Sequence, residues 1–326
     1  MFSKKLLIPL LSLSLLVTPA YSSHAAENAE AAGTSVEGQG MLSPSSSSES
    51  SESVFNGSGA GTSSEPVTDE KLETILKQVQ SQLPAENGTW AVFISDLVNG
   101  TEGSLNDQKM QAASLIKLYI MGAVYENYDQ ITGQYGRDSV DSNLYSMITV
   151  SDNDVFENPI LAKGTIAVAK ALAETDAITI IGGGDSAAGM QAVNSFCQAH
   201  GYDQTHMGRM LLASNENDDN YTSVGDCGHL LQEIYKQDTS GYTHATDMFN
   251  LLKAQTRCNK IPAQLPEGVK TANKTGELDN VENDAGIIYD SKNDVVIVFM
   301  SQNLSSAGSA QNTIATLSRT IYDYYN

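Results

Sequence analysis

Apolar residues recur along the chain with a helical period in two places. Both stripes have apolar positions three or four residues apart, which is typical of an amphipathic helix. The first lies at 68–83 and the second at 313–325, with Leu72, Ile75, Leu76, Val79 and Leu83 in one and Ile314, Leu317, Ile321 and Tyr325 in the other. Between them, the continuous apolar run from Leu118 to Val124 predicts a buried helix that begins near Ser114 and ends near Tyr128.

Shorter apolar runs bounded by polar turns predict the strands. Thr89–Leu97 is one, and the turn at Asn99-Gly100 leads into a second short strand. A helical stretch around Leu251 and Leu252 ends before Pro262. Three further strands follow, joined by polar connections at Asp279–Asn283 and Asp290–Asp294, and we place them at Val269–Gly276, Ala285–Tyr289 and Val295–Met300.

The first 66 residues do not fit a folded domain. Lys4 and Lys5 precede an apolar stretch, Leu6–Val17, that is too short to span a bilayer, and Ser23-His24-Ala25 forms a small-x-small cleavage site. Residues 1–25 therefore read as a signal peptide. Residues 26–66 read as a disordered Ser/Glu-rich linker, with eight serines among the eleven positions 43–53. We expect a secreted or cell-wall-associated protein, without a membrane span, whose folded domain covers 67–326.

Net charge and composition limit the classes of binding partner that we expect. The formal net charge is −21, which argues against nucleic acid or anionic lipid. The cysteines are Cys197, Cys227 and Cys258, of which two could form a disulfide and leave one free in an exported protein. Neither the cysteines nor the histidines have a metal-ligand spacing, so we expect no metal and no cofactor.

Three short motifs carry candidate chemistry. In Ser114-Leu115-Ile116-Lys117 the serine and lysine are three residues apart and share a helix face, which would place an amine beside a hydroxyl. A serine becomes a nucleophile only when a base takes its proton, and a lysine with a lowered pKa can be that base. Ser151-Asp152-Asn153 and Lys274-Thr275-Gly276 follow in this order along the chain.

The ordered trio of motifs resembles the class A β-lactamase-like serine hydrolases of the penicillin-recognising superfamily. The resemblance extends from about Thr68 to Asn326 and includes Asp284-Ala285-Gly286 after the third motif. It implies an α/β (α+β) fold, with an antiparallel five-stranded sheet flanked by helices, an all-helical lobe, and the site between them. It also implies a monomer that acts on β-lactams or on D-Ala-D-Ala-type stem peptides of peptidoglycan.

The same resemblance implies a role for each matching residue. Ser114 would be the acylated nucleophile, Lys117 its activator, and Ser151 the group that passes a proton to the leaving nitrogen. Lys274 would attract the substrate carboxylate. The substrate-binding positions would be Asn153, for the side-chain amide, and the strand residues Thr275, Gly276 and Glu277, where the backbone N–H of Glu277 would join that of Ser114 in an oxyanion hole.

One part of the class A signature is missing. Those enzymes activate the deacylating water with a glutamate in a Glu-x-x-Leu-Asn sequence that follows an arginine. Here Arg209 is followed by Met210-Leu211-Leu212-Ala213-Ser214, and Leu211 occupies the expected position. Glu216 and Asp218 are the nearest carboxylates, although a solvated loop is their more ordinary role. Loss of a general base costs about 10²–10⁴-fold in rate, so this sequence predicts slow turnover of the acyl-enzyme.

A second resemblance covers residues 155–188, from Val155 to Ala188. This atypical insert, with Gly182-Gly183-Gly184-Asp185, is similar to a fragment of phosphoglycerate kinase near its nucleotide site, where Glu157 would match the ribose-contacting glutamate. We interpret it as foreign to the hydrolase, either a real chimera or an assembly artefact. If real, it would add an apolar strand at Ala177–Ile181 beside the second motif and could disturb it.

Three functions stay open at this point. The first is a serine hydrolase that forms an acyl-enzyme at Ser114, either as a β-lactamase or as a slow penicillin-binding protein or D,D-peptidase. The second is a non-catalytic, wall-associated binding protein, favoured by the missing glutamate and the insert. The third is nucleotide binding through Gly182–Asp185.

Overall fold

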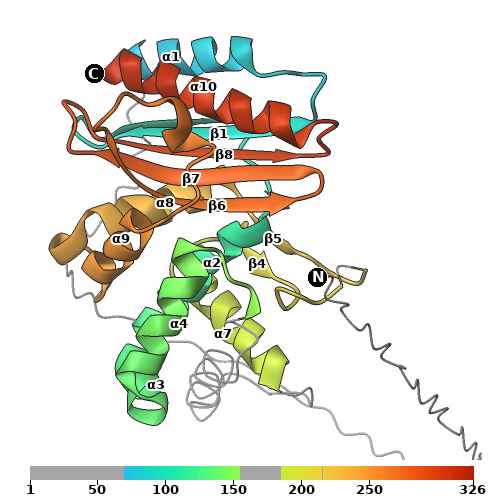
Figure 1. The fold of residues 1–326 in the computed structure, drawn as a ribbon, viewed down its shortest axis with the longest axis vertical. Helices are drawn as coiled ribbons and strands as arrows, with labels where there is room; N and C mark the ends of the chain where they lie inside the picture. Colours follow the sequence, from blue (N-terminus) through green and yellow to red (C-terminus); the bar gives the residue numbers. More distant parts are fainter. Residues whose placement is uncertain (1–69, 155–184, 215) are drawn as a thin grey trace, which may run out of the picture. The chain divides into compact units, whose positions relative to one another are not determined.

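A computed structural model describes residues 70–154, 185–214 and 216–326 (Figure 1). The predicted signal peptide and linker lie outside these ranges, as does the predicted strand at 177–181. The described residues all belong to one unit, Gly61–Asn326. Within that described part, no helix is long and apolar enough to cross a membrane.

The centre of the described unit is a five-stranded antiparallel sheet in the order β2-β1-β8-β7-β6. Its strands are β1 (Thr89–Asp96), β2 (Thr101–Leu105), β6 (Lys270–Leu278), β7 (Val281–Tyr289) and β8 (Val295–Gln302). The sequence-based prediction of a five-stranded antiparallel sheet is confirmed.

Strand β8 explains how this sheet is stabilised. Its side chains alternate between two hydrophobic cores, with Val296, Val298 and Met300 in one and Val295, Ile297 and Phe299 in the other. Both faces of the strand are therefore covered, which accounts for its uninterrupted apolar sequence.

Helices cover the two faces of the sheet (Figure 1). Helices α1 (Glu70–Gln82) and α10 (Ala307–Tyr325) pack on one face through their apolar stripes. Helices α8 (Val224–Tyr235) and α9 (Ala245–Lys253) pack on the other. The two stripes read from the sequence thus face the same core.

The helical lobe consists of α2 (Ile116–Glu126), α3 (Tyr128–Tyr135), α4 (Arg137–Thr149) and α7 (Asp185–Ala199). Every residue of α2 from Ile116 to Tyr125 is buried, as its apolar run predicts. At Gly122 a Cβ atom would lie 2.4 Å from the ring of Phe196, so a glycine is needed where α2 and α7 approach each other.

A small sheet that the sequence analysis did not predict joins the lobe to the large sheet. It contains β3 (Met110–Gln111), β5 (Asn220–Thr222) and β4 (His206–Met207), in the order β3-β5-β4. Single-turn 3₁₀ helices lie at Ala113–Leu115, Gln237–Thr239 and Ile261–Gln264. Strands of two or three residues carry too short a pattern to be recognised in a sequence.

Three sequence-based expectations are corrected. The connection predicted at Asp279–Asn283 is only the turn at Asp279-Asn280, because Glu282 and Asn283 are buried inside strand β7. The closing helix begins at Ala307, six residues before the predicted start. The possible disulfide is absent, since Cys197, Cys227 and Cys258 are all free thiols.

Candidate functional site

Ser114 lies in a tight turn between the two sheets. The turn is the 3₁₀ helix Ala113–Leu115, which precedes helix α2, and Ala113 has a positive φ of 47°. Backbone and side-chain hydrogen bonds hold it from both sides. Ala112 N–H donates to the Asn220 carbonyl at 2.8 Å, and the Asn283 side-chain amide donates to the Gln111 carbonyl at 2.9 Å. Ser114 is therefore presented by a fixed loop and not by a regular helix N-terminus.

Lys117 follows Ser114 by three residues, in the first turn of α2, and is fully buried. Its Nζ donates to Asn153 Oδ1 at 2.6 Å, to the Ser151 carbonyl at 2.8 Å and to Ser151 Oγ at 3.3 Å. Among the described residues, none of its hydrogen bonds goes to the Ser114 hydroxyl. Burial lowers the pKa of Lys117 to about 7, with Arg257 acting in the same direction and Asp152 opposing both.

Lys274 reaches the same serine from strand β6. Its Nζ donates to Ser151 Oγ at 2.9 Å and to the Thr275 carbonyl at 2.8 Å. Complete burial holds the pKa of Lys274 well below its usual value, and the positive charges of Lys117 and Arg257 lower it further. Ser151 has a positive φ of 62°, a strained conformation that places its hydroxyl between the two amines.

Gly276 brings the edge of strand β6 against the Ser114 turn. A Cβ atom at this position would lie 2.9 Å from the Ala112 carbonyl oxygen and 3.1 Å from the backbone nitrogens of Ser114 and Leu115. No side chain fits this gap without movement of the backbone. The third residue of Lys274-Thr275-Gly276 is thus a glycine for a steric reason.

Of the eight residues predicted from the motifs, the structure brings seven together through contacts or direct sequence adjacency. The two lysines meet at Ser151 and Asn153, and Gly276 packs on the turn that holds Ser114, with Thr275 buried next to it. Glu277 differs, because its side chain turns away to Arg257 Nη1 at 2.7 Å and Lys260 Nζ at 3.1 Å.

Sequence reasoning missed Arg257 and Lys260. Lys260 is fully buried and binds Glu282 Oε2 at 2.6 Å, the Asn283 carbonyl at 3.0 Å and the Gly276 carbonyl at 3.4 Å. It therefore ties together the strands behind the site. Both residues lie in the irregular connection between α9 and the 3₁₀ helix Ile261–Gln264. A cation in such a connection is usually a surface residue, so the sequence carried no signal for either.

The loop that should hold a deacylating base is organised around Arg209. Its Nε forms an ion pair with Asp219 at 2.7 Å, and its Nη1 donates to the carbonyls of Met210, Leu211 and Ala213. Asp219 is the one buried carboxylate in the described part of this loop, and Gln111 and Arg209 hold its pKa low despite burial. Asp219 is therefore ionised, and its ion pair holds Arg209 in the loop.

Two carboxylates near the position of the missing glutamate, Glu216 and Asp218, were considered from the sequence, and both are exposed. Glu216 lies in the solvated part of the loop, and Asp218 pairs with His206 at 3.0 Å on the surface. Leu211 itself is partly buried against the main hydrophobic core. No described carboxylate in 209–219 is thus placed as a base at Ser114.

No group of three or more His, Cys, Asp or Glu side chains in the described ranges could hold a metal ion. Of the Gly182–Asp185 turn considered for nucleotide binding, the three glycines lie outside the described residues, and Asp185 begins helix α7.

Comparison with known proteins gives a family and a fold. The profile of the beta-lactamase enzyme family matches residues 71–138 and 184–325. A β-lactamase from Sphaerobacter thermophilus aligns with a TM-score of 0.60 and 20% identity, over 76% of this chain and 95% of that chain. A leucine-to-glutamate mutant of PBP-A, solved as an acyl-enzyme complex with penicillin G, aligns with a TM-score of 0.60 and 19% identity, over 77% and 96%.

A separate comparison matches a short segment to another enzyme. Phosphoglycerate kinase from Clostridium novyi is 76% identical over 34 residues, which are 10% of this chain and 8% of that protein. The chain thus spans less than a tenth of the length of this relative. The predicted resemblance of a short segment to phosphoglycerate kinase is confirmed at this scale.

Proposed function

The chain belongs to the beta-lactamase enzyme family, and from that premise we propose that it is a serine hydrolase whose acyl-enzyme forms on Ser114. The observation that carries the proposal is the convergence on Ser151. Its hydroxyl lies 2.9 Å from Lys274 Nζ and 3.3 Å from Lys117 Nζ, next to the turn that presents Ser114. Two buried amines thus meet at one hydroxyl beside the turn of Ser114, and in this proposal they relay the proton of the attacking serine.

In this proposal Lys117 is the general base. A pKa of about 7 leaves about half of the Lys117 amines neutral at pH 7, and a neutral amine can accept the proton of the attacking hydroxyl. Ser151 then carries a proton to the leaving nitrogen. Asn153, fixed by its 2.6 Å bond from Lys117, is at the position that receives the amide of the substrate side chain.

Positive charge and backbone donors complete the proposed site. Arg257 supplies positive charge for the carboxylate shared by β-lactams and D-Ala-D-Ala peptides, and Lys274, whose pKa is lowered, lies near it as a hydrogen-bond donor. The backbone N–H groups of Ser114 and Glu277 form the oxyanion hole, and Thr275 offers a hydroxyl to the substrate. The close approach of Gly276 to the Ser114 turn supports this arrangement, because it brings the two donor segments together.

We further propose that hydrolysis of the acyl-enzyme is slow. Leu211 stands where a class A enzyme would have its glutamate, and the nearby carboxylates are exposed or engaged. The leucine-to-glutamate change in the aligned PBP-A structure shows the same pair of residue types in a related fold. We therefore favour a penicillin-binding protein or D,D-peptidase that acts as an exported monomer on peptidoglycan stem peptides.

A non-catalytic wall-binding role is the second candidate, and one observation favours it. The family profile leaves residues 139–183 unmatched, and this range contains Ser151 and Asn153. The segment similar to phosphoglycerate kinase follows directly after them. A disturbed second motif would leave the fold intact and the chemistry lost.

Labelling with a fluorescent penicillin separates these functions. The full chain and its Ser114→Ala variant are incubated with the label and followed over time. Label that requires Ser114 and persists supports the slow-turnover hydrolase. Label that appears and is released within seconds would show a β-lactamase with another deacylating base. Folded protein that never acquires label would contradict acylation and support the wall-binding role.

A further inference from the structure

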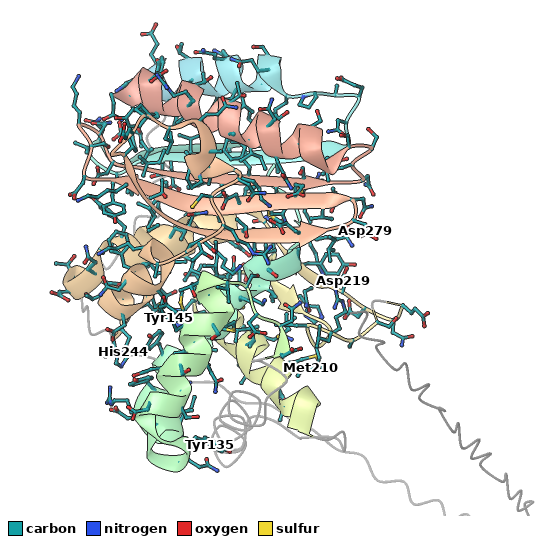
Figure 2. All side chains as sticks on the ribbon, in the orientation of Figure 1. Tyr135, Tyr145, Met210, Asp219, His244 and Asp279 are labelled. Carbon is teal, nitrogen blue, oxygen red and sulfur yellow. The ribbon has the colours of Figure 1, made fainter. Side chains whose placement is uncertain are left out.

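A cavity of about 370 Å³ lies in the helical lobe, apart from the Ser114 site. Its wall comes from helices α2, α3, α4 and α9 and includes Tyr125, Tyr128 and Tyr145. Tyr145 projects from α4 in Figure 2 with 53% of its surface exposed, on the side where His244 also lies. A second cavity of about 320 Å³ shares Tyr125 and Tyr128 with the first.

Tyr125 brings a hydroxyl to the wall of this cavity. The residue is only 6% exposed, but its hydroxyl oxygen is not among the buried polar atoms that lack a partner, so this oxygen is open to the cavity. Burial also raises the pKa of Tyr125, so the group stays a neutral hydroxyl that can both donate and accept. A ligand with polar groups can therefore form a hydrogen bond with it.

The charged groups of the wall are already engaged. Tyr128 donates its hydroxyl hydrogen to Asp141, and Arg137 lies over the Tyr128 ring, 4.9 Å from its centroid. Asp247 receives a hydrogen bond from His244 Nδ1 at 2.9 Å. In the described wall of the larger cavity, Arg137, Asp141 and Asp247 each contact another side chain of the fold, so a neutral ligand fits this cavity better than a cation or an anion.

The wall of the cavity combines a flat apolar surface with neutral polar groups, and a fitting ligand should have the same two features. The exposed Tyr145 ring offers a face to C–H groups, while the Tyr125 hydroxyl and the Asn250 amide offer hydrogen bonds at the rim. A sugar ring has this character, with C–H groups on its faces and hydroxyls around its edge.

Two helices of the cavity wall lead along the chain to residues of the Ser114 site. Helix α4 carries Tyr145 and ends two residues before Ser151, and α9 leads to Arg257. Hydrogen bonds join these two paths, from Thr256 N–H to the Thr149 carbonyl at 3.0 Å and from the Gln255 amide to the Ile148 carbonyl at 3.1 Å. Between Tyr145 and Ser151, Val150 adds a second exposed apolar side chain, 47% exposed.

We propose that the cavity lined by Tyr125, Tyr128 and Tyr145 binds a neutral oligosaccharide. This binding is a function additional to acylation at Ser114 and does not require it. A glycan held along α4 and α9 would keep attached groups close to the Ser114 site.

The test is titration of the full chain with chitotetraose, a neutral oligosaccharide, by isothermal calorimetry. Tyr145→Ala removes the exposed ring and should weaken binding about tenfold. Tyr125→Phe removes one hydroxyl without changing the packing and should weaken it about two- to tenfold, as expected for one neutral hydrogen bond. Val98→Ala, an exposed apolar residue in another part of the fold, and Tyr202→Phe, a phenol in a different cavity, should have no effect.

Absence of binding by the wild-type chain, or equal weakening by the control variants, would overturn the proposal. Binding of tetramethylammonium in place of chitotetraose would also overturn it and assign the cavity to cations. Thermal unfolding of each variant separates lost binding from lost structure, and Tyr125→Phe remains informative if Tyr145→Ala fails to fold. Penicillin labelling of Ser114 is read in the same samples, so failure of one function is distinguished from failure of the other.

Discussion

Ser151 shows why this site depends on single residues. Its hydroxyl receives hydrogen bonds from two buried lysines, and two ammonium ions so close to each other repel. Burial together with mutual repulsion favours the neutral amine, which is the form that can act as a base. Burial and charge repulsion therefore cost stability, and the same two effects lower the lysine pKa values so that a neutral amine can act as a base.

The pH dependence of acylation follows from the pKa of Lys117. Only the neutral amine accepts the Ser114 proton, and the neutral fraction increases as pH rises through about 7. We expect the labelling rate to rise about tenfold per pH unit below pH 6 and to level off above about pH 8. The measurement is the initial rate of penicillin labelling between pH 5 and 9.

A guanidinium at this position provides the control. Lys117→Arg keeps the positive charge but cannot lose its proton, so labelling should fall about 10²–10⁴-fold across the whole range. A rate that is independent of pH in the wild-type chain, or an active Lys117→Arg variant, would show that another group is the base.

At the scale of elements, the hairpin of β6 and β7 holds the site in place. Strand β7 has consecutive buried polar residues at Glu282, Asn283 and Asp284, which is unusual for a strand inside a sheet. Their partners explain it. Lys260 bonds Glu282 and the Asn283 carbonyl, while Ile261 N–H and the Asn273 amide donate to Asp284. Burial still raises the pKa of Asp284 to about 6.

Lys260→Met tests this hairpin. The substitution keeps the apolar stem of the side chain but leaves the buried carboxylate of Glu282 without its cation. Removal of one partner of a buried pair costs about 3–5 kcal/mol, and we expect this decrease in the free energy of unfolding. Urea denaturation measures it.

Two further variants make the result specific. Lys236 pairs with Glu233 at the surface, so Lys236→Met should change stability by at most about 1 kcal/mol. Adding Glu282→Gln to Lys260→Met removes the unpaired charge and should recover part of the loss. Equal effects of Lys260→Met and Lys236→Met would contradict a structural role for the buried ion pair.

At the scale of the whole molecule, burial in the hydrophobic core determines which of the three cysteine thiols a reagent can reach. Cys197 and Cys227 are 1% and 0% exposed, and burial raises the pKa of the Cys227 thiol to about 12. Cys258 is exposed, next to Arg257. A thiolate and not a thiol reacts with disulfide reagents, so burial protects the first two doubly.

We therefore expect Ellman's reagent to modify one thiol in the folded chain and three in urea. Cys258→Ser should reduce the folded count to zero. Recovery of fewer than three thiols in urea without a reductant would show a disulfide and contradict the free thiols of the structure.

The sequence by itself determined the main helices and strands of the large sheet and located the three motifs. The stripes of α1 and α10, the buried run of α2 and the apolar sequence of β8 could be read because periodicity reflects which sides of an element are covered. Ser114, Lys117, Ser151 and Lys274 could be read because their motifs are local and ordered.

Only the tertiary structure decided how those motifs meet and which other residues join them. Arg257, Lys260 and the Tyr125 cavity depend on segments that are far apart in the chain, and no local pattern records such contacts. The same holds for Glu282 and Asn283, which read as a polar turn until Lys260 is placed beside them. Polar residues are buried when a partner from elsewhere satisfies them, and folding supplies that partner.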